Sequence, residues 1–207
     1  MKLSLDSVGK RFNQQLVFKG LDHEFSSASK TAILGSNGSG KSTLIKILSH
    51  SLSPTEGKIK YFNSDGSEIP ATQIPFQISL AAPYLELIEE LSAYEFLNFY
   101  QKFKPLIEGI DTAKFLEICY LENSKNKEIK KFSSGMKQRF RLGLAFLSDV
   151  SLILLDEPSS NLDAKGMAWY KELITKYLAN RTLIIGSNYS ADEIEVCDER
   201  VEIERYS

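Results

Sequence analysis

A glycine-rich segment constrains this chain more than any other feature. Gly35-Ser36-Asn37-Gly38-Ser39-Gly40-Lys41-Ser42 fits G-x-x-x-x-G-K-S/T, and it separates an apolar strand predicted over 30–34 from a helix predicted over 41–48. The glycines let the backbone turn so that successive N–H groups point inward at the start of a helix, which creates a binding site for phosphate groups. The pattern therefore predicts a phosphate-binding loop.

Two side chains of this segment carry the predicted chemistry. Lys41 can reach the β- and γ-phosphates of a nucleotide, and the Ser42 hydroxyl can ligate Mg²⁺. A flexible loop without a ligand is the alternative, and the flanking strand and helix argue against it. The predicted nucleotide-binding residues here are Gly35, Ser36, Asn37, Gly38, Ser39, Gly40, Lys41, Ser42 and Thr43.

A second motif supports this interpretation. The apolar run Leu152–Leu155 is followed by Asp156 and Glu157, as in a Walker B strand. We expect Asp156 to hold Mg²⁺ through water, and Glu157 to polarise the water that attacks the γ-phosphate. A strand that ends in two carboxylates is usually structural, but together with the phosphate loop it predicts a hydrolytic site.

The order of predicted elements indicates an α/β fold. Short strands dominate the first third, helices fill about 83–132, and the last third alternates helix from 134, strand 152–155, helix 163–178 and strand 182–185. Such alternation favours a parallel or mixed sheet covered on both faces, with the helical middle as an insertion.

Two S-x-x-E patterns predict helix starts by capping boxes, one from Ser92 to Glu95 and one from Ser190 to Glu193. The helix after Ser92 carries an aromatic stripe at helical spacing. We expect this stripe to form the core of a small helical lobe rather than a surface for a membrane partner. Its members are Phe96, Phe99, Tyr100 and Phe103.

Composition excludes several classes. The 25 basic and 27 acidic side chains give a formal net charge of −2, which argues against binding to nucleic acid through its phosphates. The two cysteines, Cys119 and Cys197, form no CxxC or Cys/His cluster, so we expect a cytoplasmic location, where the compartment is reducing. No run reaches the roughly 20 apolar residues that span a bilayer, so we expect a soluble chain.

Two further motifs lie in the expected order around the Asp-Glu pair. Phe132–Arg139 resembles the signature motif of the ABC transporter ATPase family, and Pro158–Asp163 resembles its D-loop. This resemblance covers essentially the whole chain. It implies one ABC-type ATPase domain over 1–207, with a P-loop NTPase α/β core formed by 1–82 and 133–207. It also implies an N-terminal antiparallel β subdomain and a helical subdomain over about 83–132.

The resemblance also implies roles for single residues. Phe12 would stack on adenine, while Ser134 and Gly135 would contact the γ-phosphate of ATP held by a second subunit. Ser133 or Ser134 would cap the following helix, and Asp163 would both cap its own helix and reach across the dimer interface.

Three departures from the family pattern stand out. Asn188 occupies the place of a histidine that touches the γ-phosphate, so we expect slow but measurable hydrolysis with Asn188 in that role. The glutamine expected near Mg²⁺ is missing, because the register points to Ala82 or Pro83 and Gln77 lies too early. In the signature, Ser134 replaces the first glycine and Met136 replaces the glutamine.

The resemblance implies an ATP-binding and ATP-hydrolysing subunit that uses ATP and Mg²⁺. The implied partners are a transmembrane permease subunit and a second ATPase copy, with no nucleic acid, at the inner face of the cell membrane. The chain looks closest to compact haem-exporter subunits. Two alternatives are a soluble ABC-family ATPase unlinked to transport and a nucleotide-binding regulatory subunit with very low turnover.

Overall fold

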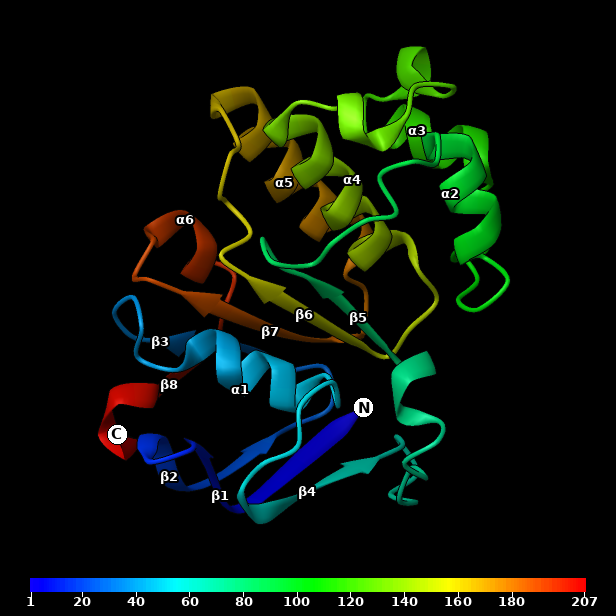
Figure 1. Ribbon diagram of the computed structural model, residues 1–207. Coiled ribbons are helices and arrows are strands. Elements are labelled where there is room, and N and C mark those ends of the chain that lie inside the picture. Colours follow the sequence, from blue (N-terminus) through cyan, green and yellow to red (C-terminus); the bar gives the residue numbers. More distant parts are fainter.

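The computed structural model describes residues 1–207 and contains two β-sheets (Figure 1). The smaller sheet is antiparallel, with the order β2 (Gln15–Phe25), β1 (Lys2–Phe12), β4 (Glu56–Phe62). The larger sheet is parallel, with the order β5 (Ile78–Ala81), β6 (Leu152–Asp156), β7 (Thr182–Ser187), β3 (Lys30–Leu34), β8 (Glu199–Glu202). The predicted α/β fold with a parallel sheet is confirmed.

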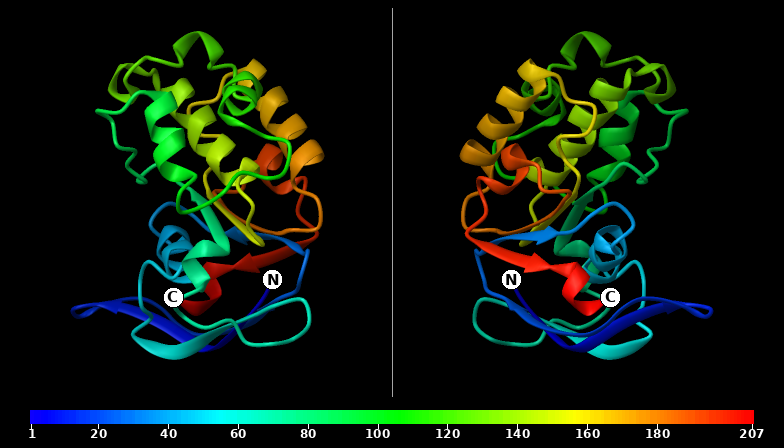
Figure 2. Two further views of the ribbon diagram at one scale, coloured as in Figure 1. Left: turned by 90° about the vertical axis from the view of Figure 1, so that its right-hand side faces the viewer. Right: turned by 90° about the vertical axis from the view of Figure 1, so that its left-hand side faces the viewer.

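Helices separate and cover these sheets (Figures 1 and 2). Helix α1 (Lys41–Leu48) lies between the two sheets, and α4 (Ser134–Leu147) and α5 (Ala164–Tyr177) lie on the other face of the parallel sheet. Beyond them lie α2 (Ala93–Tyr100) and α3 (Thr112–Ile118), and α6 (Ala191–Ile194) follows β7. Short 3₁₀ turns span Ile74–Phe76, Glu122–Ser124, Ile129–Lys131 and Ile203–Tyr206.

The central strands are apolar on both faces because both faces are covered. All five residues of β6 and all six of β7 are buried. One group of buried side chains fills the space around α1, and a second lies beneath α4 and α5 and extends to α2 and α3. The longest helices, α4 and α5, have 14 residues each, and no helix has the length and apolar character needed to span a bilayer.

The first predicted capping box is confirmed and the second is wrong. Ser92 N–H donates to Glu95 Oε2 at 2.9 Å, and Glu95 N–H donates to Ser92 Oγ at 3.3 Å. The Ser190 side chain accepts no hydrogen bond from the start of α6. Glu193 turns into the protein instead, because hydroxyl and N–H donors from other segments satisfy its carboxylate there.

The aromatic stripe divides between core and surface. Phe96 is buried and packs edge-on against Phe140, with ring centroids 5.4 Å apart. Phe99 and Phe103 are 46% and 58% exposed, so the prediction that the whole stripe forms a core is wrong. Helix α2 ends at Tyr100, so Phe103 lies beyond the helix and leaves the buried face.

Candidate functional site

The glycine-rich segment connects the carboxyl end of β3 to the first residue of α1. Gly38 and Gly40 have φ angles of 84° and 105°, which side chains with a Cβ rarely adopt. A Cβ on Gly40 would also stand 2.8 Å from Val17 Cγ1 of β2. Both the backbone conformation and the close approach of β2 therefore require glycine at position 40.

Lys41 is buried inside this loop. The residue is only 4% exposed. Its Nζ donates to the carbonyl oxygens of Gly35 at 2.9 Å and Ser36 at 3.0 Å. These bonds fix a positive charge at the N-terminus of α1, where the helix end itself favours anions.

A cavity of about 340 Å³ opens between this loop and the end of β6. It brings together the lysine, hydroxyl and carboxylate that the sequence placed in two distant motifs. Its lining residues are Val17, Asn37, Gly38, Gly40, Lys41, Ser42, Thr43 and Glu157. The arrangement provides a cationic, N–H-rich concavity with one carboxylate at its wall, which suits a phosphorylated ligand and an attacking water.

Asp156 lies behind this wall and is 2% exposed. Its Oδ1 atom is buried without a hydrogen-bond partner. Burial raises the pKa of the Asp156 carboxyl, while the neighbouring Ser42 hydroxyl and Lys41 ammonium oppose the shift. A carboxylate oxygen that lacks a partner beside a serine hydroxyl is a donor set that fits Mg²⁺.

Glu157 has a left-handed backbone, with φ 46°. Its N–H donates to the carbonyl oxygen of Gly186 in β7 at 2.9 Å, and its own carbonyl oxygen accepts from Ser160 N–H at 3.1 Å. A non-glycine residue in this conformation costs about 1–3 kcal/mol and persists only where neighbours fix it. The two bonds therefore aim the Glu157 side chain towards the phosphate loop.

A second cavity, of about 360 Å³, borders the outer side of the loop. Here Glu204 of the last 3₁₀ turn accepts from Ser36 N–H at 2.8 Å and from Ser36 Oγ–H at 2.6 Å. Gln15, Leu16 and Val17 also line this cavity. Sequence reasoning missed Val17 and Glu204, and no local signal points to either.

Phe12, predicted to stack on adenine, lies at the end of β1 and is 48% exposed. It lines neither cavity of the loop, and Lys10 Nζ lies 5.0 Å from the centroid of its ring. One aromatic face is therefore near a cation, and adenine stacking by Phe12 stays a prediction.

The signature and D-loop residues lie next to each other at the N-termini of α4 and α5. Ser133, rather than Ser134, caps α4, with Met136 N–H 3.2 Å from Ser133 Oγ. Asp163 caps α5 through Gly166 N–H at 2.7 Å. A Cβ on Gly135 would stand 3.3 Å from the carbonyl oxygen of Asn161.

These residues stay apart from the cavity of their own chain. Ser134, Gly135 and Asp163 line neither cavity at the phosphate loop, and the exposed Asn188 at the end of β7 does not line one either. The structure thus joins Lys41, Ser42 and Glu157, and it leaves Phe12, Ser134, Gly135, Asp163 and Asn188 outside that group.

Tyr84 lies just after Ala82 and Pro83, the positions at which the family pattern predicts the missing glutamine. Burial and the nearby Asp156 carboxylate raise the pKa of its phenol, and Lys46 Nζ of α1 lies 4.0 Å from its ring centroid. Ala82, the residue after β5, is fully buried, and Tyr84 lies near both Asp156 and Lys46. Gln77 lies at the opposite end of β5, where its Oε1 accepts from Ser151 Oγ–H at 2.9 Å.

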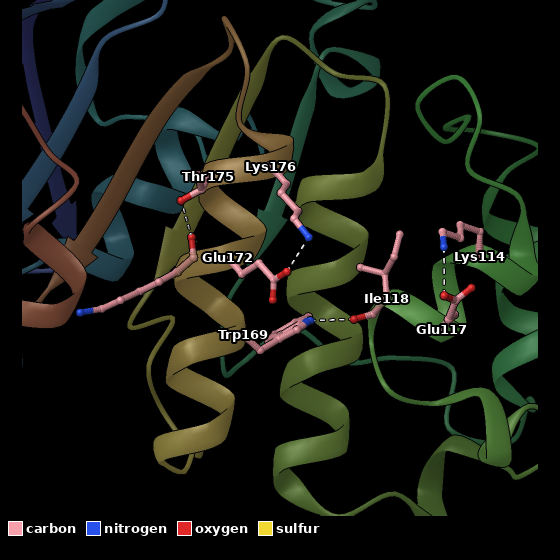
Figure 3. Close-up of polar contacts among 8 residues, drawn as sticks. Lys114, Glu117, Ile118, Trp169, Glu172, Thr175 and Lys176 are labelled. Atoms are coloured by element: carbon pink, nitrogen blue, oxygen red, sulfur yellow. Dashed lines mark hydrogen bonds and ion pairs between the residues drawn. The ribbon is translucent and has the colours of Figure 1, made fainter.

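A cavity of about 320 Å³ lies away from this site, between α3 and α5 (Figure 3). Trp169 Nε1–H donates to the carbonyl oxygen of Ile118 at 2.7 Å beside it. Its charged rim is paired along the helices, with Lys114 on Glu117 at 3.0 Å and Lys176 on Glu172 at 2.5 Å. Of these contacts, the bond from Trp169 to Ile118 joins α5 to α3, and the two ion pairs lie within single helices.

The fold and this site define a P-loop nucleotide-binding protein. The sequence profile of the ABC transporter family matches residues 18–160. The chain is 30% identical over 199 residues to the protein named "Uncharacterized ABC transporter ATP-binding protein YybJ" of Bacillus subtilis (strain 168), covering 95% of this chain and 90% of that one. The chain belongs to the ABC transporter family, and it is an ATPase of that family.

Other relatives differ in how much of their length this chain covers. It is 26% identical to the Streptococcus pyogenes lantibiotic transport ATP-binding protein SrtF, covering 93% of this chain and 82% of that protein. It is 30% identical to human phospholipid-transporting ATPase ABCA7, but it spans only 10% of that protein.

Solved structures show the same fold. A Pyrococcus furiosus putative ABC transporter ATP-binding protein superposes over 100% of both chains with a TM-score of 0.79 and 19% identity. A dimeric ATP-binding cassette bound to ADP and Pi superposes over 98% of this chain and 95% of that one, with a TM-score of 0.81 and 20% identity.

Proposed function

We propose that this chain binds Mg²⁺ and ATP and hydrolyses ATP to energise a separate membrane-embedded permease subunit. The observation that carries the proposal is the cavity in which Glu157 faces Lys41 and Ser42. Membership of the ABC transporter family indicates ATP hydrolysis as the reaction. The cavity contains a lysine, a hydroxyl and a carboxylate, which are the kinds of group that this reaction uses.

The chain's own groups divide the work. The N–H groups of the phosphate loop and Lys41 neutralise and orient the phosphates. Ser42 and Asp156 would hold Mg²⁺, which neutralises charge on the phosphates when bound. Glu157 accepts a proton from the attacking water, and its fixed backbone keeps the carboxylate aimed at the cavity.

We further propose that two copies sandwich ATP. The phosphate loop of one copy would meet Ser134 and Gly135 of the other, and Asp163 would reach across the same interface. Support comes from their location, because Ser134 and Asp163 are exposed and lie outside the cavity of their own chain. The cassette bound to ADP and Pi that superposes on this chain is described as dimeric.

The permease partner would dock on the helical subdomain that we propose over about 83–132. Phe99 and Phe103 are exposed there and contact each other edge-on, with ring centroids 5.2 Å apart. A pair of exposed aromatic rings is a typical anchor for a protein interface. This docking would place the chain at the inner face of the cell membrane, and the finer resemblance to haem-exporter subunits stays a prediction.

Phosphate release from ATP tests the proposed function. Purified full-length chain is incubated with ATP in the presence and absence of Mg²⁺, and Lys41→Ala serves as the matched inactive variant. Mg²⁺-dependent release by the parent, absent from Lys41→Ala, supports the proposal. Equal release by both proteins would contradict it.

A further inference from the structure

Glu193 is a buried carboxylate that neither the predicted motifs nor the nucleotide cavity uses. It lies in α6 and is 2% exposed. None of its oxygen atoms lies within ion-pair distance of a lysine, arginine or histidine nitrogen, so neutral donors alone stabilise its charge. Burying a carboxylate without a cationic partner costs free energy, so the hydrogen bonds to Glu193 must offset that cost.

The two oxygen atoms of Glu193 bind two different segments. Oε1 accepts from Ser159 N–H at 3.0 Å and from Ser159 Oγ–H at 2.5 Å. Oε2 accepts from Ser187 Oγ–H at 2.5 Å, and Ser187 Oγ in turn accepts from Ser190 N–H at 3.2 Å. The side chain thus bridges the turn after β6 and the last residue of β7.

Both segments lead directly into the proposed reaction site. Ser159 follows Glu157 by two residues and is the second residue of the D-loop, and Ser187 immediately precedes Asn188. The Glu157 N–H bond to Gly186 joins the same two strand ends through the backbone. Glu193 adds a side-chain connection just beyond that bond, where the two strands have ended and the two segments would otherwise separate.

We infer that Glu193 is a positioning residue for ATP hydrolysis. It keeps the segment that carries Glu157 and the D-loop in register with the segment that carries Asn188, so the two sides of the γ-phosphate site move as one unit. This inference rests on the proposed function. A displacement of about 1 Å at reacting groups costs on the order of 100-fold in rate, which is the reason for such a bridge.

The substitution Glu193→Gln weakens one half of the bridge and keeps the other. The amide oxygen can still accept from Ser159 N–H, which can only donate, so the amide nitrogen must face Ser187. The amide nitrogen can donate to Ser187 Oγ but cannot accept its proton, so a weaker neutral hydrogen bond replaces the charge-assisted bond to β7 while side-chain volume is kept. Glu193→Ala removes both connections and leaves buried donors unpaired, with a greater risk of unfolding.

The test is a double-mutant cycle between the two serines. The measured quantity is the rate of ATP hydrolysis in the presence of Mg²⁺. Ser159→Ala, Ser187→Ala and the double variant are compared in the parent and in Glu193→Gln. We expect the double variant to differ at least about threefold from the product of the single effects in the parent, and this coupling to be smaller in Glu193→Gln. Glu193→Gln alone should lower kcat about tenfold to 100-fold, with KM for ATP changed less than about twofold.

Asp192→Asn is the matched control, because Asp192 is the preceding residue of α6 and its carboxylate is exposed and paired with Lys171 at 2.8 Å. It should leave turnover unchanged. Serine effects that multiply independently in the parent would overturn the inference, as would a Glu193→Gln variant whose ATP affinity and Tm fall together with its rate. A parent without turnover above that of Lys41→Ala would instead contradict the proposed function, and the inference would fall with it.

Discussion

The N–H of Glu157 donates to the carbonyl oxygen of Gly186 at 2.9 Å, and this bond ties the residue after β6 to β7. The tie holds Glu157 at a φ of 46°, a conformation that an isolated glutamate would leave. In this geometry the Glu157 side chain enters the cavity of the phosphate loop rather than continuing the line of the strand. The position of Glu157 at the cavity therefore depends on how β6 and β7 end, as well as on the loop itself.

Lys41→Ala should weaken nucleotide binding. The substitution removes the buried ammonium and its bonds to Gly35 and Ser36. The loop therefore loses both the positive charge that faces the phosphates and the bonds that hold its shape. We expect Kd for ATP to rise at least about tenfold, which corresponds to about 1.4 kcal/mol. Titration with a fluorescent ATP analogue measures this, and Lys58→Ala, which removes an exposed ammonium from β4, is a control for loss of charge. Parental affinity in Lys41→Ala would contradict the assignment.

Asp156→Asn should stabilise the nucleotide-free protein at neutral pH. Burial raises the pKa of Asp156 in the folded state, so its charged form destabilises the fold above that pKa and the protonated form does not. The variant should have the higher Tm at pH 7–8, and its advantage should shrink as the pH falls through the folded pKa. Each kcal/mol shifts Tm by about 2–4 °C in a chain of this length.

The same variant should lose its response to Mg²⁺. The parent is expected to gain Tm with ATP when Mg²⁺ is added, whereas Asp156→Asn is not, because one of two proposed ligands is neutralised. Asp192→Asn, which removes an exposed carboxylate, is the control. A fall in Tm for Asp156→Asn at pH 8, or an unchanged response to Mg²⁺, would refute this account of the carboxylate.

Asn188 sets the expected rate of hydrolysis. An amide can donate one hydrogen bond to the γ-phosphate but cannot become cationic, so Asn188→His should raise turnover and Asn188→Ala should lower it. Asn188 is exposed, and neither variant should disturb the core. Phosphate release at saturating ATP measures both. If the two variants hydrolyse ATP like the parent, Asn188 has no role at the γ-phosphate.

Ser134→Glu should prevent the proposed dimer and spare the single chain. The substitution places a negative charge where the partner's γ-phosphate is expected, and Ser134 lies outside the cavity of its own chain. ATP-dependent dimerisation, followed by light scattering, should disappear while ATP affinity stays within about twofold of the parent. Ser27→Glu adds the same charge to the turn before β3, at the end of that strand opposite the phosphate loop, and should dimerise normally. A Ser134→Glu dimer would argue against the sandwich.

Local patterns explain which features could be predicted from the sequence. The strand, glycine loop and helix around Lys41 are contiguous, so the spacing of glycines, lysine and apolar residues defines them directly. Ser92 and Glu95 form the predicted capping box because both groups belong to one helix start. The central strands were recognisable because burial on both faces requires a continuous apolar run, as in β6.

Contacts between distant segments could not be predicted in this way. Glu204 binds Ser36 across 168 positions, and no periodicity brings the two together. Ser190 and Glu193 have the spacing of a capping box, yet Glu193 binds Ser159 and Ser187, since these tertiary donors compete with the local N–H. Phe103 follows the helical stripe in sequence but lies beyond the end of α2, so helix length overrides the pattern.

The central claim is that this chain hydrolyses ATP with Glu157 as the proton acceptor. Glu157→Gln keeps the size of the side chain and removes its basicity, so phosphate release should fall about 10²–10⁴-fold while ATP binding is retained. With ATP and Mg²⁺ the variant should accumulate as a stable dimer, because the sandwich closes and cannot reset. Phosphate release and light scattering on the parent and Glu157→Gln measure this directly. A variant that hydrolyses ATP at the parental rate would contradict the account.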